Sequence, residues 1–262
     1  MAKSGQARVP TSEEKKHLFD VIQEHRYPEK NTAIMQISFK LGLRAQEIAL
    51  LELKEVCQLG RSTKNVPCSY KLLKVMPLPA SYTKGADALG RSKSKYERKT
   101  LNFSVDDFDV IVRHIEKLAI AGAEIVPSEF YPSVKKHKGK SRDLPMVDTE
   151  LRHALEEYLN IRLDLAPYAK PGDPLFLTQK GNPYSPNTLQ EHMALMLRGW
   201  AGIEKASSHS GRRALITDII HNQKKSVKVA QIIAGHKNAS TTIIYEDPPE
   251  VEVSEALKNI TK

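Results

Sequence analysis

The chain has 262 residues, 40% of them hydrophobic, which suffices to bury one sizeable core or two small ones and excludes a large multidomain protein. Forty Lys and Arg against 31 Asp and Glu give a formal charge of +9, which favours a polyanionic partner, although solubility alone explains the charge equally well. The N-terminus has no apolar stretch behind its lysines, and no window approaches about 18 apolar residues, so we expect no signal peptide, no membrane span and a cytoplasmic location. Cys57 and Cys68 form no CxxC pattern, so we also expect no metal, no cofactor and no disulfide framework.

The N-terminal segment is predicted to be helical. Thr11-Ser-Glu-Glu14 forms a capping box ahead of apolar residues at helical spacing, which predicts a helix from about Ser12 to His25, ended by Pro28. A second apolar helix is predicted from about Asn31 to Leu41.

Gly42 separates that helix from a third, largely buried one that contains Ala45 and Ile48. Arg44 therefore lies at a helix start. A helix N-terminus and a guanidinium both favour a phosphate at the same place.

The segment from Lys54 to Arg142 combines short β-prone runs, such as Tyr70–Val75, with Pro, Gly and Ser. Within it, Ser104–Asp107 caps a helix that carries a clean apolar stripe, formed by Phe108, Ile111, Val112, Ile115, Leu118 and Ala119. Two basic runs, 91–99 and 135–142, flank this helix. They are either solvated loops or segments that follow a DNA backbone.

The remainder is predicted to be mainly helical. Residues 143–146 end a strand, and Asp148 caps a helix that reaches Arg162. A short strand at Pro174–Leu177 and a turn at 181–183 precede a helix opened by Ser185, and three more helical segments follow, at 212–221, 226–234 and 240–245. The expected fold is mainly α with a small antiparallel sheet or hairpin, a compact catalytic-type domain over 1–247 with a basic insertion at about 60–134.

Three short motifs occur in a characteristic order along the chain. They are Gly42-Leu-Arg44-Ala-Gln-Glu47, His209-Ser-Gly-Arg212, and Gly235-His236 followed nine residues later by Tyr245. Together they resemble the boxes of the tyrosine recombinase (phage integrase) family, whose members break and rejoin DNA through a protein-phosphotyrosine bond. The resemblance extends from about Pro10 to Tyr245 and is poor between 60 and 134. It implies the fold of the family's catalytic domain, with Glu47 supporting Arg44 from the next turn of its helix.

The resemblance also implies a lysine on a β-hairpin between the two arginines, close before a strand that ends in Pro. The segment Lys136–Pro145 has this character. Counting back from Pro145 by the common family spacing falls on His137, so Lys136 and Lys138 both remain candidates.

Family members usually carry an N-terminal helical domain that closes a clamp around DNA. This chain has about ten residues before its first predicted helix, so we expect no such domain, and either a partner or the basic insertion would take its place. The tail after Pro248-Pro249, with Val251, Val253, Ala256 and Leu257, would form a helix that docks into a neighbouring subunit or onto its own domain.

The chemistry implied by the resemblance needs no metal and no ATP. Arg44 and Arg212 would clamp the phosphate, Tyr245 would attack it, and His209 would act as the base. His236 would donate a hydrogen bond or orient the nucleophile, and the hairpin lysine would protonate the departing 5′ oxygen. DNA-backbone contacts are expected from Arg91, Lys93, Lys95, Lys135, Lys140, Arg142 and Arg213.

Single residues also have structural explanations: Tyr245 as a core tyrosine, His236 as a helix cap, Arg44 as the partner of Glu47. Their occurrence in family order favours the functional interpretation. We expect a site-specific recombinase of a mobile element, nucleoid-associated, acting on double-stranded DNA as a homotetramer or pair of dimers, with a second recombinase or a DNA-bending protein as further partners. A DNA-relaxing enzyme of the type IB topoisomerase kind and a non-cutting DNA-binding regulator are the alternatives.

Overall fold

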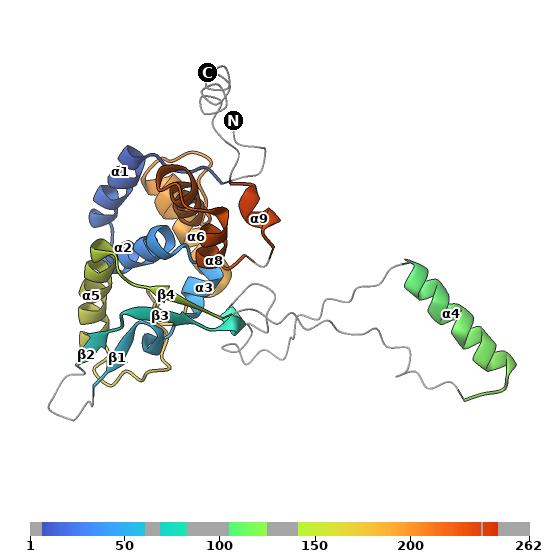
Figure 1. Cartoon of the computed structure of the whole chain (residues 1–262). Coiled ribbons are helices and arrows are strands. Elements are labelled where there is room, and N and C mark those ends of the chain that lie inside the picture. The colour runs from blue at the N-terminus through green and yellow to red at the C-terminus, as the bar shows by residue number, and fades with distance from the viewer. Residues whose placement is uncertain (1–6, 61–68, 83–104, 125–140, 237, 246–262) are drawn as a thin grey trace, which may run out of the picture. The chain divides into compact units, whose positions relative to one another are not determined.

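The computed structural model describes residues 7–60, 69–82, 105–124, 141–236 and 238–245. The chain divides into two units: residues 1–79 with 140–262, and residues 80–139. Both are drawn in Figure 1. The described parts are mostly helical with two small antiparallel sheets, which confirms the predicted fold class. Among the described residues no helix is both long and apolar enough to cross a bilayer.

Helix α1 spans Ser12–Gln23, and its predicted capping box is present: the Glu14 N–H donates to Thr11 Oγ1 at 3.1 Å, and the Thr11 N–H donates to Glu14 Oε2 at 2.9 Å. Helix α2 spans Pro28–Gln36 and continues as a π-helical segment, Ile37–Leu41. It starts earlier than predicted. Pro28 is the first residue of α2 because proline, which has no N–H, is well accommodated in a first helical turn.

Helix α3 spans Ala45–Leu50, and a 3₁₀ turn follows at Leu53–Glu55. Strand β1 (Cys57–Leu59) pairs antiparallel with β2 (Tyr70–Leu72), and β3 (Val75–Leu78) pairs antiparallel with β4 (Arg142–Pro145). Figure 1 shows β3 beside β4. The β-prone run predicted over Tyr70–Val75 does contain strand residues, namely the whole of β2 and the first residue of β3.

Helix α5 spans Thr149–Asp164, with Asp148 as its cap: Asp148 Oδ1 accepts from the Leu151 N–H at 2.9 Å. The strand predicted at Pro174–Leu177 is wrong, because this segment makes only two isolated bridges, Glu52 with Pro174 and Leu177 with Pro183. Helix α6 spans Pro186–Ala194 behind the predicted cap Ser185 and continues as a π-helical segment, Leu195–Trp200.

The C-terminal helices agree with the predicted segments. Helix α7 spans Ser210–Thr217 and continues as a π-helical turn at Asp218–Asn222. Helix α8 spans Val227–Ala234, and the short α9 spans Ser240–Ile243. Their prediction rested on apolar residues that recur at helical spacing.

The core of the first unit forms where α2 packs on α5, α3 on α6, and α7 on the π-helical segment after α2. The α7 contact is close: a Cβ on Gly211 would overlap the Ser38 hydroxyl and lie 3.1 Å from the Ser38 carbonyl carbon. Glycine thus lets α7 approach the segment that leads to Arg44. The largest fully buried side chains are Leu18, Ile22, Ile34, Met35, Ile37, Leu43, Ile48, Leu51, Leu53, Met76, Met146 and Phe176.

In the second unit, the described residues form a 3₁₀ turn, Ala80–Tyr82, and helix α4, Val105–Ile120. The helix confirms the one predicted from the apolar stripe. Its predicted cap residue Ser104 lies outside the described residues.

Candidate active site

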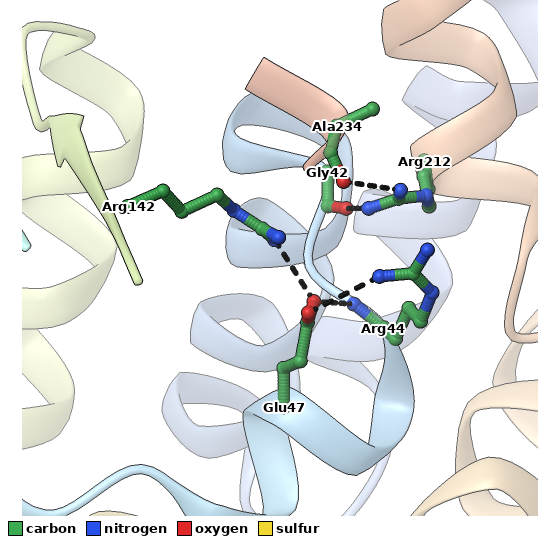
Figure 2. Close-up of polar contacts among 6 residues, drawn as sticks. All are labelled: Gly42, Arg44, Glu47, Arg142, Arg212 and Ala234. Carbon is green, nitrogen blue, oxygen red and sulfur yellow. Dashed lines mark hydrogen bonds and ion pairs between the residues drawn. The ribbon is translucent and has the colours of Figure 1, made fainter. Parts of the chain in front are cut away.

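Arg44 is fixed at the start of α3 by Glu47, as predicted. Glu47 Oε2 accepts from the Arg44 backbone N–H at 2.8 Å, and Glu47 Oε1 accepts from Arg44 Nη1 at 3.2 Å (Figure 2). Glu47 is fully buried, whereas the Arg44 side chain keeps 21% of its surface exposed. The carboxylate therefore holds one edge of the guanidinium, and part of the Arg44 side chain remains accessible.

A second arginine shares this carboxylate. Arg142, the first residue of β4, donates from Nη2 to Glu47 Oε2 at 3.0 Å, and its side chain is only 8% exposed. Buried charges need such partners, and one carboxylate here serves two guanidinium groups. The sequence predicted a DNA contact for Arg142 and did not reveal this pairing; the DNA contact stays a prediction.

Arg212, in the first turns of α7, connects two other parts of the site. Its Nη1 donates to the Gly42 carbonyl at 2.6 Å, and its Nη2 donates to the Ala234 carbonyl (Figure 2). These carbonyls lie two residues before Arg44 and two residues before His236, so one side chain ties the three motifs together. Burial, and then the nearby Arg44, lowers the pKa of Arg212 to about 9, so the guanidinium remains protonated at neutral pH.

Gly235 makes room for Arg142. It follows α8 with a φ of +63°, a left-handed conformation that favours glycine. A Cβ at this position would also overlap the Arg142 guanidinium, with its Cζ only 3.0 Å away. The glycine of the third motif therefore has a packing reason in addition to a conformational one.

His236 is buried, and its Nδ1 is hydrogen-bonded to Thr242 Oγ1 at 2.8 Å. Burial, and then the positive charges of Arg212, Arg44 and Arg142, lowers the pKa of His236 to about 3. The imidazole is therefore neutral at physiological pH. Thr242 belongs to the Ser-Thr-Thr run before the tyrosine, but its bond to His236 was not predicted.

Tyr245 follows α9 and is half-buried. Its ring stacks on that of His236, with centroids 6.2 Å apart and an interplanar angle of 15°. The guanidinium carbon of Arg213 lies 5.6 Å from the ring centroid on α7's side of the site, and His221 Nε2 donates to the Tyr245 carbonyl at 2.9 Å. Side chain and backbone of the tyrosine are thus both restrained.

These side chains surround one cavity of about 360 Å³. Five predicted catalytic residues line it: Arg44, His209, Arg212, His236 and Tyr245. No Asp or Glu is among the described residues that line it, so the cavity is cationic. The lining is completed by Ala7, Ser207, Arg213, Thr241 and Ile244.

His209 is the N-cap residue of α7 and is exposed to solvent. Arg213 donates from Nη1 to the Ala7 carbonyl at 2.9 Å, so it belongs to the wall of the cavity. The other predicted cationic residues lie outside the described residues: Arg91, Lys93, Lys95, Lys135, Lys136, Lys138 and Lys140. The predicted tail over 248–262 lies outside them too.

The sequence is similar to known proteins over part of its length. The profile of the phage integrase family matches residues 113–250. A tyrosine recombinase XerC of Methylobacterium sp. is 36% identical over 108 residues, which is 40% of this chain and 32% of that protein. Another, from Bradyrhizobium diazoefficiens, is 30% identical over 138 residues, 51% of this chain and 41% of the relative. These aligned regions are less than half the length of the curated relatives.

The fold is similar to solved structures over essentially the whole chain. A crystal structure of XerA recombinase superposes with a TM-score of 0.57 at 16% identity, covering 100% of this chain and 66% of the other. The integrase of transposon Tn1549, in complex with transposon right end DNA, gives a TM-score of 0.54 at 16% identity, covering 99% and 68%. At this identity the likeness concerns the fold alone.

Proposed function

The chain belongs to the phage integrase family, and from that premise we propose that it cuts and rejoins DNA as a site-specific recombinase, with Tyr245 as the nucleophile. The observation that carries the proposal is the convergence of Arg44, His209, Arg212, His236 and Tyr245, from separate segments of the chain, on one cavity. A cationic cavity that contains a tyrosine, and whose described lining residues include no carboxylate, suits a phosphodiester.

The first step is charge neutralisation. As the phosphorus becomes five-coordinate, negative charge accumulates on its non-bridging oxygens. A guanidinium group can donate two parallel hydrogen bonds to these oxygens. Arg44 keeps part of its guanidinium accessible, and Arg212 is held rigidly by two backbone carbonyls. Both groups are therefore oriented before DNA arrives.

The second step is attack. The Tyr245 oxygen forms a bond to phosphorus while the bond between phosphorus and the 5′ oxygen breaks, which leaves a 3′-phosphotyrosine and a 5′ hydroxyl. His209 accepts the phenol proton; it lines the cavity and is exposed to solvent. His236, which is neutral, acts as a hydrogen-bond donor to phosphate and as a stacking support for the tyrosine ring.

The departing oxygen must gain a proton. We assign this role to Lys136 or Lys138, close before β4 in the sequence. In the reverse reaction a new 5′ hydroxyl attacks the phosphorus and loses its proton to the lysine, while the bond between phosphorus and the Tyr245 oxygen breaks and the phenol regains its proton from His209. The phosphotyrosine retains the energy of the bond first broken, so rejoining needs no ATP. The reaction exchanges strands when two DNA sites are paired by a tetramer.

The proposal is tested by trapping the covalent intermediate. A nicked suicide substrate that loses its 5′ end after cleavage is incubated with the protein and separated on a denaturing gel. The wild-type protein is expected to form a covalent protein-DNA species, Tyr245→Phe none, and Tyr168→Phe as much as the wild type, since Tyr168 is an exposed tyrosine outside the cavity.

Two results would contradict the recombinase assignment. If the wild type and Tyr245→Phe bind DNA equally and the wild type forms no covalent species, a non-cutting DNA-binding regulator would be favoured. A covalent species together with relaxation of plasmids that lack a specific site, and without tetramers on DNA, would favour a topoisomerase-like enzyme.

A further inference from the structure

The first unit contains a second, larger cavity of about 660 Å³. It is formed by the start of α2, the turn over 178–182 and one face of α6 with its π-helical extension. The described residues that line it do not include any that line the active-site cavity. Its volume falls in the usual range of sites for small ligands, and the proposed strand cleavage does not use it.

A buried ammonium group defines one side of this cavity. Lys30 is only 7% exposed, donates to the Leu177 carbonyl at 3.0 Å, and lies 4.5 Å from the centroid of the Tyr27 ring. Among the described residues no carboxylate pairs with it. Because an ammonium has three donors, Lys30 can donate to a further acceptor, and an anionic one would offset the cost of its burial.

The charge of the whole lining favours an anion. Arg26 and Lys180 add two further cations to Lys30, and the described lining includes no Asp or Glu. Burial, and then the charge of Lys30, lowers the pKa of His192 to about 4, so this imidazole remains neutral and polar at physiological pH. The described lining of the cavity therefore carries positive charge that no lining carboxylate neutralises.

The other walls are flat aromatic surfaces. Trp200 stacks on His25 with ring centroids 3.8 Å apart and an interplanar angle of 12°, and Tyr184 stacks on His192. Tyr27 is 46% exposed and has a φ of +63°. A bulky residue in this left-handed conformation is strained, and strain of this kind concentrates at functional sites.

We propose that this cavity binds a nucleotide, with its base against the rings of Tyr27 and Trp200 and its phosphate at Lys30 and Lys180. A planar ring joined to an anion is the ligand class that such a combination of aromatic surface and cations fits. The nucleotide could come from two sources, a free mononucleotide or an unpaired nucleotide of single-stranded DNA. The site is independent of the tyrosine chemistry.

The chain offers a direct probe, because Trp200 is its single tryptophan. A nucleotide in the cavity should quench Trp200 fluorescence. We would titrate the full-length protein with AMP, with a short single-stranded oligonucleotide and with inorganic phosphate, exciting at the red edge of indole absorption. Saturable quenching by AMP or by the oligonucleotide is expected, and the tighter of the two identifies the source.

Two variants test the assigned contacts. Lys30→Met removes the ammonium and keeps the chain length, and Tyr27→Gly removes the ring while relieving the backbone strain. Each is expected to weaken binding by roughly tenfold or more. Lys225→Met is the matched control; Lys225 is exposed and lines neither cavity, so its loss should leave the affinity unchanged.

Three outcomes would overturn the proposal. The first is the absence of saturable quenching by AMP and by the oligonucleotide in protein whose circular dichroism shows it is folded. The second is equal affinity in Lys30→Met, Tyr27→Gly and the wild type. The third is quenching by inorganic phosphate as strong as by AMP, which would show an anion site without base recognition. Each is distinct from failure of the covalent-trapping test.

Discussion

Glu47→Gln should be the most damaging single-atom change in the active site. Glu47 is fully buried and accepts three hydrogen bonds, from the Arg44 N–H, from Arg44 Nη1 and from Arg142 Nη2. Removing one partner of a buried ion pair costs about 3–5 kcal/mol, because the other charge is left uncompensated. Gln retains one acceptor oxygen and Arg44 is partly exposed, so we expect about 3 kcal/mol, the lower end of that range.

The assay is urea unfolding followed by circular dichroism, with the free energy taken from the midpoint and slope. Adding Arg142→Met to Glu47→Gln removes the uncompensated buried cation. The double variant should therefore be more stable than the sum of the two single effects by about 1 kcal/mol or more. Because the Arg142–Glu47 pair is shielded from solvent, the cost of Glu47→Gln should change little between low and high salt.

Two results would refute this reasoning. One is a cost below about 1 kcal/mol for Glu47→Gln, which is the range of exposed ion pairs. The other is strict additivity of Glu47→Gln and Arg142→Met, which would mean that the carboxylate does not hold Arg142. Arg152→Met, at another arginine outside the Glu47 contacts, is the control for loss of a positive charge.

Three further predictions concern the same unit. The free energy of unfolding should fall as pH falls from about 6.5 to 3. The pKa values of His236 (about 3) and His192 (about 4) are lowered in the folded chain, which therefore binds fewer protons than the unfolded one in this range. In His192→Gln the urea midpoint should depend less steeply on pH than in the wild type. Gly235→Ala should cost more than Gly202→Ala, measured by thermal unfolding, since both have positive φ but only Gly235 faces a side chain. Gly211→Ala should lower the unfolding free energy by about 1–3 kcal/mol, because its Cβ would overlap the Ser38 hydroxyl and lie tightly against the Ser38 backbone.

Local signals predicted the helices well. The capping box at Thr11–Glu14 and the caps Asp148 and Ser185 each need a specific side chain a fixed number of residues from a backbone N–H, so they are visible in the sequence. The π-helical extensions after α2, α6 and α7 were not predicted, because they leave the apolar spacing almost unchanged.

The strands were predicted less well. The run Tyr70–Val75 is uniformly β-prone, and nothing in it marks Leu72 as an end and Val75 as a beginning. The break is set by partners: β2 pairs with the nearby β1, whereas β3 pairs with β4 across the second unit's segment of the chain. Pairing over such a separation depends on tertiary structure and has no local sequence signal.

In the active site, the contacts that could be predicted are those that require one kind of side chain. The support of Arg44 needs a carboxylate one helical turn on, and Glu47 is visible there. Arg212 instead donates to the carbonyls of Gly42 and Ala234, which any residue would supply, so neither partner has a signature. The same holds for Arg142, whose place depends on the absence of a Cβ at Gly235. The sequence therefore predicts which groups would act on phosphate in the proposed reaction, and the structure explains what holds the described ones in position.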